Sequence, residues 1–279
     1  MTALSEILFP TDLSPESDRA FEHARFLAQA FEARLTLFHA ARVPPSEYGA
    51  WTQGHEAEVW ERVETEARRV LGLQAKDLKT PHQIVVRHDV PSTPLLADLA
   101  ILNEIQAARP GLVVMATRSR HGFDRYFVGS VTEQVVRHAE CPVLSVREPE
   151  HGGPLAYRVV LLSTDLSPAS RRAYPMAALL ARRFGARVVA VHVVPKGTDG
   201  ASARAAVADE LGPELAGIEL EVRIEEGRSA WSRIVGAARE ERADVVALAR
   251  QGSDSLGDKI LGSNTDRVLR YAPCPVLVA

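Results

Sequence analysis

The residues from Ala249 to Ser263 have the types and spacing of a phosphate-binding loop. An apolar run at 245–248 precedes them, and Gly262-Ser263 stands directly before a helical pattern that begins at Asn264. A loop between a strand and a helix start aims several backbone N–H groups at one point, and the positive end of the helix dipole favours an anion there. We therefore expect a phosphate cradle in this loop.

The same arrangement occurs earlier in the chain. An apolar run at 113–115 leads into a loop from Ala116, and Gly129-Ser130 opens another helical pattern. The sequence thus predicts two phosphate cradles, and the remaining elements are those that must position them.

Composition limits the classes of protein. The length of 279 residues suits two domains of about 100–150 residues each. The 33 basic and 36 acidic residues give a net charge of −3, without the basic surplus typical of duplex binding, so we expect no nucleic-acid partner. No run approaches the roughly 20 apolar residues that span a bilayer, so we expect no membrane partner. The first residues lack the order of a secretory signal, so the expected location is cytoplasmic.

Apolar runs and helical periodicities alternate along the first half, which is typical of parallel βαβ units. Ser14 before Pro15 predicts a helix start, because serine suits the N-cap and proline suits the first helical position. The expected strands are 7–9, 35–38, 83–87, 112–115 and 141–146, and the expected helices follow Pro15, begin near Glu56, and span 95–107 and 131–138.

The pattern then repeats. Thr-Asp-Leu-Ser-Pro at 11–15 recurs at 164–168, which is an offset of 153. Cys-Pro-Val-Leu at 141–144 recurs at 274–277, where the offset is 133. The period is far above the roughly 20–50 residues of solenoid repeats, so it indicates two similar domains.

Domain boundaries follow from this repeat. A segment rich in proline and glycine at 148–156 is the expected linker between domains 1–147 and 157–279. The fall in offset from 153 to 133 predicts a deletion in the second copy, equal in length to the difference between the two offsets. The segment near 45–72, which holds two of the three tryptophans, is the candidate for an insert in the first copy.

These motifs, repeated in the same order, resemble the universal stress protein (UspA-like) family, here with two copies in tandem. The resemblance implies an α/β fold with two Rossmann-like (adenine nucleotide alpha hydrolase-like) domains. Each would be an open five-stranded parallel sheet of order 3-2-1-4-5 with helices on both faces. Nucleotide-binding members hold ATP at the carboxyl ends of the strands, where the strand order reverses.

The family's phosphate motif is Gly, two residues, Gly, nine residues, then Gly with Ser or Thr. Glycine suits such loops because it allows φ > 0 and close approach of the backbone to phosphate. Ser119 would carry strain on the order of 1 kcal/mol or more at positive φ, so we expect ATP in the second copy. The matching positions are Ala249, Gly252, Gly262 and Ser263 in the second copy, and Ala116, Ser119, Gly129 and Ser130 in the first.

Side-chain charge favours the first copy instead. Its loop carries four basic or histidine side chains, whereas the second loop mixes both signs. The carboxylates Asp254 and Asp258 would repel phosphate unless Mg²⁺ lay between them and the ligand. The number of ATP sites and a role for Mg²⁺ therefore stay open at this point. The side chains concerned are Arg118, Arg120, His121 and Arg125 in the first loop, and Arg250, Asp254, Asp258 and Lys259 in the second.

The resemblance also implies a site for adenosine. The aspartate after the first strand contacts the adenosine end, and the backbone after the histidine of the second strand recognises adenine. The alternative for either aspartate is a turn or capping role without a ligand. The implied positions are Pro10, Thr11, Asp12 and Ala40 in the first copy, and Ser163, Thr164, Asp165 and Val193 in the second.

Two other features have competing interpretations. Ser130 and Ser263 either donate to phosphate or cap their helices, with Glu133 and Asp266 three residues on as capping-box partners. His39 and His192 suit a hydrogen-bonded histidine at a strand end better than a catalytic base. No Gly-x-Ser-x-Gly elbow and no metal-ligand spacing occur, so we predict no catalytic residue and no metal site.

The last strand of each copy follows a Cys-Pro pair. We expect Cys141 and Cys274 to be packing residues, and Pro142 and Pro275 to begin their strands or to lie at an edge. Family members pair these strands across a dimer, so the resemblance implies an intramolecular pseudo-dimer and leaves a homodimer open.

The expected function is a tandem universal stress protein that binds ATP in at least one domain and has a regulatory, stress-response role. Without a positioned nucleophile or general base, any ATPase activity should be slow. The alternative is a dimeric scaffold or partner-binding module that has lost nucleotide binding, which the missing glycines favour.

Overall fold

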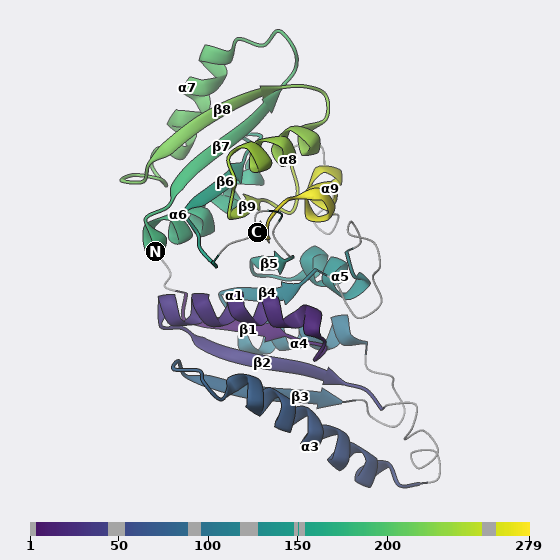
Figure 1. Cartoon of the computed structure of the whole chain (residues 1–279). Coiled ribbons are helices and arrows are strands. Elements are labelled where there is room, and N and C mark those ends of the chain that lie inside the picture. The colour runs from purple at the N-terminus through teal and green to yellow at the C-terminus, as the bar shows by residue number, and fades with distance from the viewer. Residues whose placement is uncertain are drawn as a thin grey trace.

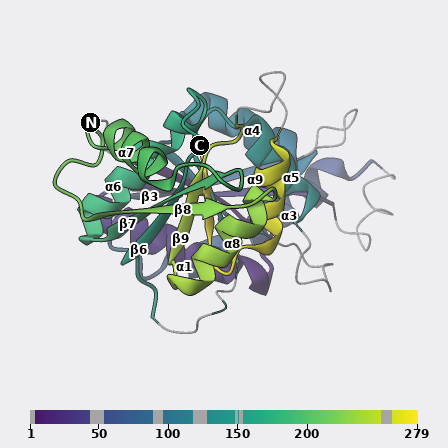
Figure 2. The ribbon, with the colours of Figure 1, turned by 90° about the horizontal axis from the view of Figure 1, so that it is seen from above.

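The protein, represented by a computed structural model, forms one ten-stranded sheet. Its strand order is β3-β2-β1-β4-β5-β10-β9-β6-β7-β8. The first half of the chain (purple to teal) and the second half (green to yellow) lie one above the other in Figure 1. Seen from above, the second half lies over the first (Figure 2). The structure describes residues 4–43, 54–88, 96–117, 128–147, 150, 154–252 and 261–279.

Each half has the predicted strand order 3-2-1-4-5, and every pairing within a half is parallel. The first half contains β1 (Glu6–Pro10), α1 (Pro15–Phe31), β2 (Arg34–Ala41), α3 (Glu56–Ala75), β3 (His82–His88), α4 (Ala97–Ala108), β4 (Leu112–Ala116), α5 (Ser130–His138) and β5 (Val143–Val146). The second half contains β6 (Val159–Ser163), the 3-10 turn η2 (Ser170–Ala173), α6 (Tyr174–Phe184), β7 (Arg187–Val194), α7 (Gly200–Leu211), β8 (Leu220–Glu226), α8 (Ala230–Glu240), β9 (Val245–Leu248), α9 (Ser263–Tyr271) and β10 (Val276–Val278).

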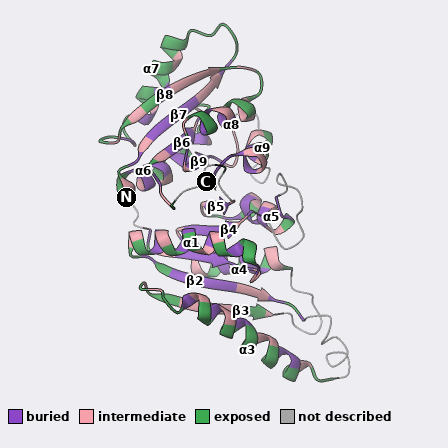
Figure 3. Ribbon diagram, in the orientation of Figure 1, coloured by how far each residue is buried: buried purple, intermediate pink, exposed green. Residues whose placement is uncertain are grey.

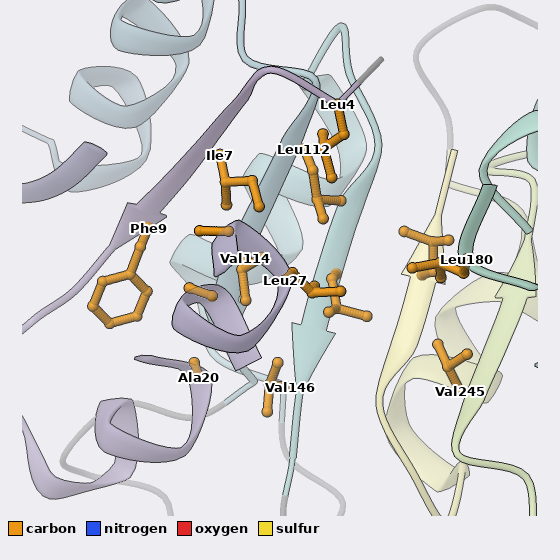
Figure 4. Packing of buried hydrophobic residues seen from close by; sticks show 14 of the residues in the cluster. Leu4, Ile7, Phe9, Ala20, Leu27, Leu112, Val114, Val146, Leu180 and Val245 are labelled. Carbon is orange, nitrogen blue, oxygen red and sulfur yellow. The ribbon is translucent and has the colours of Figure 1, made fainter. Parts of the chain in front are cut away.

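Helices cover both faces of the sheet, as predicted. One apolar core lies under α1, α3, α6 and α7, and the other under α4, α5, α8 and α9. Figure 3 shows buried positions along the strands and exposed ones on the outer surfaces of α3 and α7. Side chains from β1, β4 and α1 meet in the first core, among them Ile7, Val114 and Leu27 (Figure 4). Strands covered on both faces are apolar along their whole length, which explains the unbroken apolar runs in the sequence.

The two halves join through β5 and β10, which form the one antiparallel pair among the pairings that the structure describes. Leu144 lies opposite Leu277 in this pair. Pro142 and Pro275 stand directly before these strands, where a missing N–H removes no ladder hydrogen bond.

The cysteines before these prolines are unpaired. Burial raises the pKa of Cys141 to about 11 and raises that of Cys274 further. A thiol is the unreactive form, so both side chains fit the predicted packing role.

Aromatic side chains fill the seam between α1 and α6. Phe26 stacks on Phe184 with centroids 5.2 Å apart, and Tyr157 stacks on the same ring at 5.3 Å. Tyr157 is 1% exposed, and its hydroxyl lies 2.7 Å from Nδ1 of the buried His23. Such aromatic pairs contribute about 0.5–1.5 kcal/mol each beyond the area that they bury.

On the opposite face of the sheet, polar contacts link α5 to α9. Arg270 bonds Asp266 of its own helix at 2.9 Å and reaches Glu133 of α5 at 3.3 Å. Arg147 donates to three carbonyl oxygens at the end of α9, at 2.7–3.3 Å. The seam is thus apolar on one face of the sheet and charged on the other.

The difference in length between the copies falls at two places. Strands β3 and β8 start at His82 and Leu220, so most of the predicted deletion lies between the second and third strands. The rest lies before the next helix, because the offset reaches its final value where α4 and α8 start, at Ala97 and Ala230. Helix α3 has 20 residues and α7 has 12.

Of the two tryptophans near the predicted insert, one can be placed. Trp51 lies outside the described residues, and Trp60 of α3 stacks on His88 at 4.5 Å. The Trp60 side chain therefore packs locally, against the end of β3.

The helices after the first strand also differ. In the first copy α1 starts at Pro15 as predicted, whereas the second copy has the 3-10 turn η2 before α6. Pro175 explains the difference, because it has no N–H to donate to a preceding turn and is accepted only near the start of a helix.

We expect the buried histidine at the seam to make stability depend on pH. Burial, with a smaller contribution from the Arg19 charge, lowers the pKa of His23 from 6.5 to about 3. Below about pH 6.5 the unfolded chain therefore binds a proton at this position and the folded chain does not. The free energy of unfolding accordingly decreases as the pH is lowered, by up to about 1.4 kcal/mol per pH unit. Urea unfolding from about pH 7 down to pH 5 should show a shallower fall for His23→Gln than for the wild type. Parallel pH profiles for the two proteins would contradict this assignment.

Candidate functional site

A cavity of about 440 Å³ opens at the carboxyl ends of β6, β7 and β9. It lies where the strand order reverses, the position at which open α/β sheets bind ligands. All eight positions predicted in the second copy line this cavity. They are Ser163, Thr164, Asp165, Val193, Ala249, Gly252, Gly262 and Ser263.

Thr164 holds the turn after β6. Its N–H donates to Val191 O at 3.1 Å, and its hydroxyl accepts from Leu166 N at 3.0 Å. The hydroxyl also lies 2.6 Å from the hydroxyl of Tyr174. Leu166 has φ of 63°, a left-handed conformation that is rare for a bulky residue.

Leu13 has φ of 60° at the matching place in the first half, and Thr11 Oγ1 accepts from its N–H at 3.0 Å. The same strained turn thus occurs in both copies at the mouth of the sheet. Backbone strain of this kind is often found at ligand sites.

Asp165 combines a turn contact with a steric one. Its Oδ1 accepts from Ser167 N at 3.0 Å and from Ser167 Oγ at 2.6 Å, which is the turn role given as the alternative to ligand binding. Its Oδ2 lies 2.7 Å from the position that a Cβ would occupy at Gly252. Any side chain at 252 would therefore have to displace the Asp165 carboxylate from this position.

Of the two reasons expected for the motif glycines, a positive φ is wrong at three positions. Gly252 is outside the left-handed region. Gly129 and Gly262 both have φ of −60° and are the N-caps of α5 and α9. Any residue can adopt that conformation, so φ does not explain the glycine at 129 or at 262.

The capping interpretation of Ser130 and Ser263 is also wrong. Each serine is the first residue of its helix, after the glycine N-cap, and neither helix has a side-chain cap hydrogen bond. Asp266 N donates to Gly262 O at 2.9 Å, so the N–H groups of 263–265 precede the first intrahelical bond. Such N–H groups have no acceptor inside the helix and can bind an anion.

Two hydrogen bonds fix the start of α9 against the end of β9. Gly262 N donates to Arg250 O at 3.0 Å, and Thr265 Oγ1 donates to Ala249 O at 3.0 Å. These bonds close the base of the loop, so the open N–H groups have a defined direction.

The first half has the same bonds. Gly129 N donates to Thr117 O at 2.8 Å, and Thr132 Oγ1 donates to Ala116 O at 2.9 Å. Pro10, Thr11, Asp12, Ala40, Ala116, Gly129 and Ser130 occupy the positions equivalent to the second-half lining, at the carboxyl ends of β1, β2 and β4 and the start of α5.

The first-half aspartate is bonded differently. Asp12 Oδ1 accepts from Ser14 N at 3.0 Å, from Ser14 Oγ at 2.5 Å and from Ser17 Oγ at 2.8 Å. The Ser14 side chain therefore bonds the aspartate, although Ser14 is the N-cap of α1 as predicted. More of the Asp12 carboxylate is engaged by its own turn than is the case for Asp165.

Part of each phosphate loop lies outside the described residues. Ser119 is among them, and so are most of the charged side chains whose balance favoured the first copy. That comparison of charge stays a prediction. The residues concerned are Arg118, Ser119, Arg120, His121, Arg125, Asp254, Asp258 and Lys259.

The strand-end histidines are hydrogen-bonded, as predicted. His39 Nδ1 donates to Thr11 O at 2.8 Å, and His192 Nδ1 donates to Thr164 O at 2.9 Å. Each ring ties the second strand to the turn after the first, which is a structural role. Within the described ranges, no three His, Cys, Asp or Glu side chains gather as metal ligands.

Some lining residues were not predicted. Ala230 and Ile234 come from α8, which the sequence pattern did not connect with the loop. Asn264 Oδ1 accepts from Trp231 N at 3.2 Å and so joins the starts of α8 and α9. The position of Asn264 directly after Gly262-Ser263 was the one sequence signal that could have indicated its place in the lining. The others are Ser170, Leu248, Gln251, Leu261 and Thr265.

Each half is a Rossmann-like α/β domain: a doubly wound parallel sheet with a strained turn after the first strand and a glycine-capped helix after the fourth. The sequence profile described as "Universal stress protein family" matches residues 4–147 and 156–279. The chain therefore belongs to the universal stress protein family, as a tandem of two family domains.

Relatives share the tandem length. A universal stress protein of Mycobacterium tuberculosis is 26% identical, with 98% of this chain and 96% of the relative covered. One of Mycolicibacterium smegmatis is 28% identical with the same coverage. The crystal structure of a universal stress protein from Archaeoglobus fulgidus has a TM-score of 0.76 at 23% identity, over 100% of this chain and 99% of that one, which shows the same fold. No helix in the described part of this chain is long and apolar enough to cross a membrane.

The strained turn offers a matched pair of substitutions. Thr164→Val keeps the side-chain shape but removes the acceptor of Leu166 N and the nearer partner of Tyr174 OH, which keeps Ser170 Oγ at 3.2 Å, and should cost about 1–3 kcal/mol of stability. Thr11→Val should cost less, because the residue equivalent to Tyr174 is Phe21. Thermal melting measures both, and adding Tyr174→Phe to Thr164→Val should recover part of the loss. Equal losses at 11 and 164, with no recovery, would refute this account of the turn.

Proposed function

We propose that this protein binds ATP in its second domain and acts as a regulatory stress-response protein. The observation that carries the proposal is the open cavity that joins the turn after β6, the end of β7 and the start of α9. Its volume of about 440 Å³ lies within the roughly 300–1,000 Å³ typical of small-molecule sites.

The triphosphate would lie at the start of α9. There the N–H groups of 263–265 supply donors and the helix dipole supplies positive potential. Gly252 lets the Asp165 carboxylate lie against the loop, since a Cβ at 252 would be 2.7 Å from Asp165 Oδ2. Adenosine would extend toward Asp165 and the main chain at Val193, with Ile234 and Leu248 as apolar walls.

The residues around the cavity support binding better than hydrolysis. Among its described lining residues the one carboxylate is Asp165, which already holds its own turn. The His192 Nδ1–H is already donated to Thr164 O. We therefore propose at most a slow ATPase, and Mg²⁺ enters as a companion of the triphosphate.

We further propose that domains 1–147 and 157–279 act as an intramolecular pseudo-dimer in the cytoplasm. The β5–β10 pairing and the aromatic seam support the first part. Two unpaired cysteines suit a reducing compartment, which supports the second.

ATP should stabilise the folded chain by an amount that rises with the logarithm of its concentration over Kd. Binding to the folded state alone adds about 2.7 kcal/mol at 100 times Kd, which thermal melting with ATP and Mg²⁺ detects. Nucleotide released by acid precipitation of the purified protein is a second measurement. No released nucleotide and no shift at millimolar ATP would favour a scaffold that has lost nucleotide binding.

The two copies should respond differently to blocking substitutions. Gly252→Val places a branched side chain against Asp165 Oδ2 and should abolish more ATP binding than Ser119→Val, the matched change in the first copy. Calorimetric titration of ATP into each variant gives the comparison. Equal losses, or a greater loss for Ser119→Val, would show that the basic first loop governs binding.

A further inference from the structure

A second cavity, of about 430 Å³, lies at the opposite ends of the second-half strands. Its lining comes from α1, from the segment 154–159 that enters β6, from 241–244 between α8 and β9, and from Cys274-Pro275 before β10. It thus touches both halves of the chain. A strand of five residues is about 16 Å long, so this cavity is separate from the proposed ATP site.

Three arginines line this cavity, and they outnumber its two carboxylates, Glu241 and Asp244. Arg158 and Arg242 are exposed, and their guanidinium groups make no ion pair in the described part of the chain. Arg19 bonds Glu22 at 3.0 Å through Nη1, while its Nε is buried without a hydrogen-bond partner.

The two acidic side chains in the lining are already engaged. Asp244 Oδ2 accepts from Arg158 N at 2.6 Å and from Val159 N at 2.9 Å. Glu241 accepts from Arg187 at 2.9 Å and from Arg223 at 3.0 Å, and these guanidinium groups hold its pKa below the usual value. Arginines outside the lining therefore compensate Glu241, whereas the bonds to Asp244 come from neutral backbone N–H groups and leave its charge to offset one of the three cavity arginines.

The remaining lining is apolar or neutral. Leu155, Ala156 and Ala243 contribute carbon surface, and His23 is a neutral ring at ordinary pH because burial lowers its pKa to about 3. A compact site with several guanidinium groups and apolar walls suits an organic anion, since guanidinium binds carboxylate and phosphate oxygens in pairs.

We propose that this seam cavity binds a small organic polyanion whose carboxylate or phosphate groups contact Arg19, Arg158 and Arg242. The ligand would bridge α1 of the first half and the 154–159 and 241–244 segments of the second. It would therefore stabilise the seam independently of nucleotide at the other end of the sheet.

The test is calorimetric titration of the full chain with citrate and, separately, with inorganic phosphate, each with and without saturating ATP. Citrate or phosphate should bind at one site per chain, and Arg158→Ala/Arg242→Ala should weaken that binding at least about tenfold. Both arginines are exposed, so the variant should keep its fold and its response to ATP. Arg25→Ala, an exposed arginine of α1 outside the lining, is the control and should bind as the wild type does.

The two anions separate the ligand classes, because citrate binding alone indicates carboxylates and phosphate binding alone indicates phosphate esters. A second readout is the Arg19 Nε–H resonance, which should shift on addition of the anion that binds while that of Arg25 stays in place. Absence of binding at about 10 mM of either anion, or equal affinity of wild type and double variant, would overturn the proposal. Failure of ATP to bind would leave it standing.

Discussion

Parallel pairing on both sides of β6 is the constraint on which the site depends. Leu162 of β6 lies opposite Ala190 of β7 and Ala247 of β9, so these three strands end at the same edge of the sheet. Their continuations are the Thr164 turn, Val193 and the loop that leads into α9. No side chain has to reach far, because the register of buried strands brings these segments to one point.

The two halves share this framework and differ in the details that decide what it holds. Tyr174 and Pro175 replace Phe21 and Glu22, so the second copy gains a hydroxyl beside Thr164 and loses the first turns of its helix. Arg250 stands where the first copy has Thr117, and burial lowers the pKa of its guanidinium. The two copies of the fold therefore differ in the residues at the carboxyl ends of their strands.

Much of the fold could be predicted because its signals are local or repeated. Unbroken apolar runs identified strands that are covered on both faces, and two copies of the Thr-Asp-Leu-Ser-Pro turn fixed the domain count. The eight second-half positions lie at one cavity because a short motif and a parallel register suffice to bring them together.

Other features depend on contacts that one sequence does not display. The close approach at Gly252 comes from Asp165, which is far away in the chain, whereas the sequence pattern predicted a positive φ or a close approach to phosphate. The serine after each motif glycine was placed at the cap, where the chain uses the glycine. The α8 wall of the cavity and the arginines at the seam arise from packing of distant elements, which periodicity does not report.

The most direct measurement of the central claim is a backbone amide NMR titration of the full chain with ATP and Mg²⁺. The account predicts that the largest shifts occur at Gly262 and at residues 263–265, with smaller ones at Asp165 and Val193. Shifts confined to 129–132 would place the ligand in the first domain. An unchanged spectrum at millimolar ATP would contradict nucleotide binding altogether.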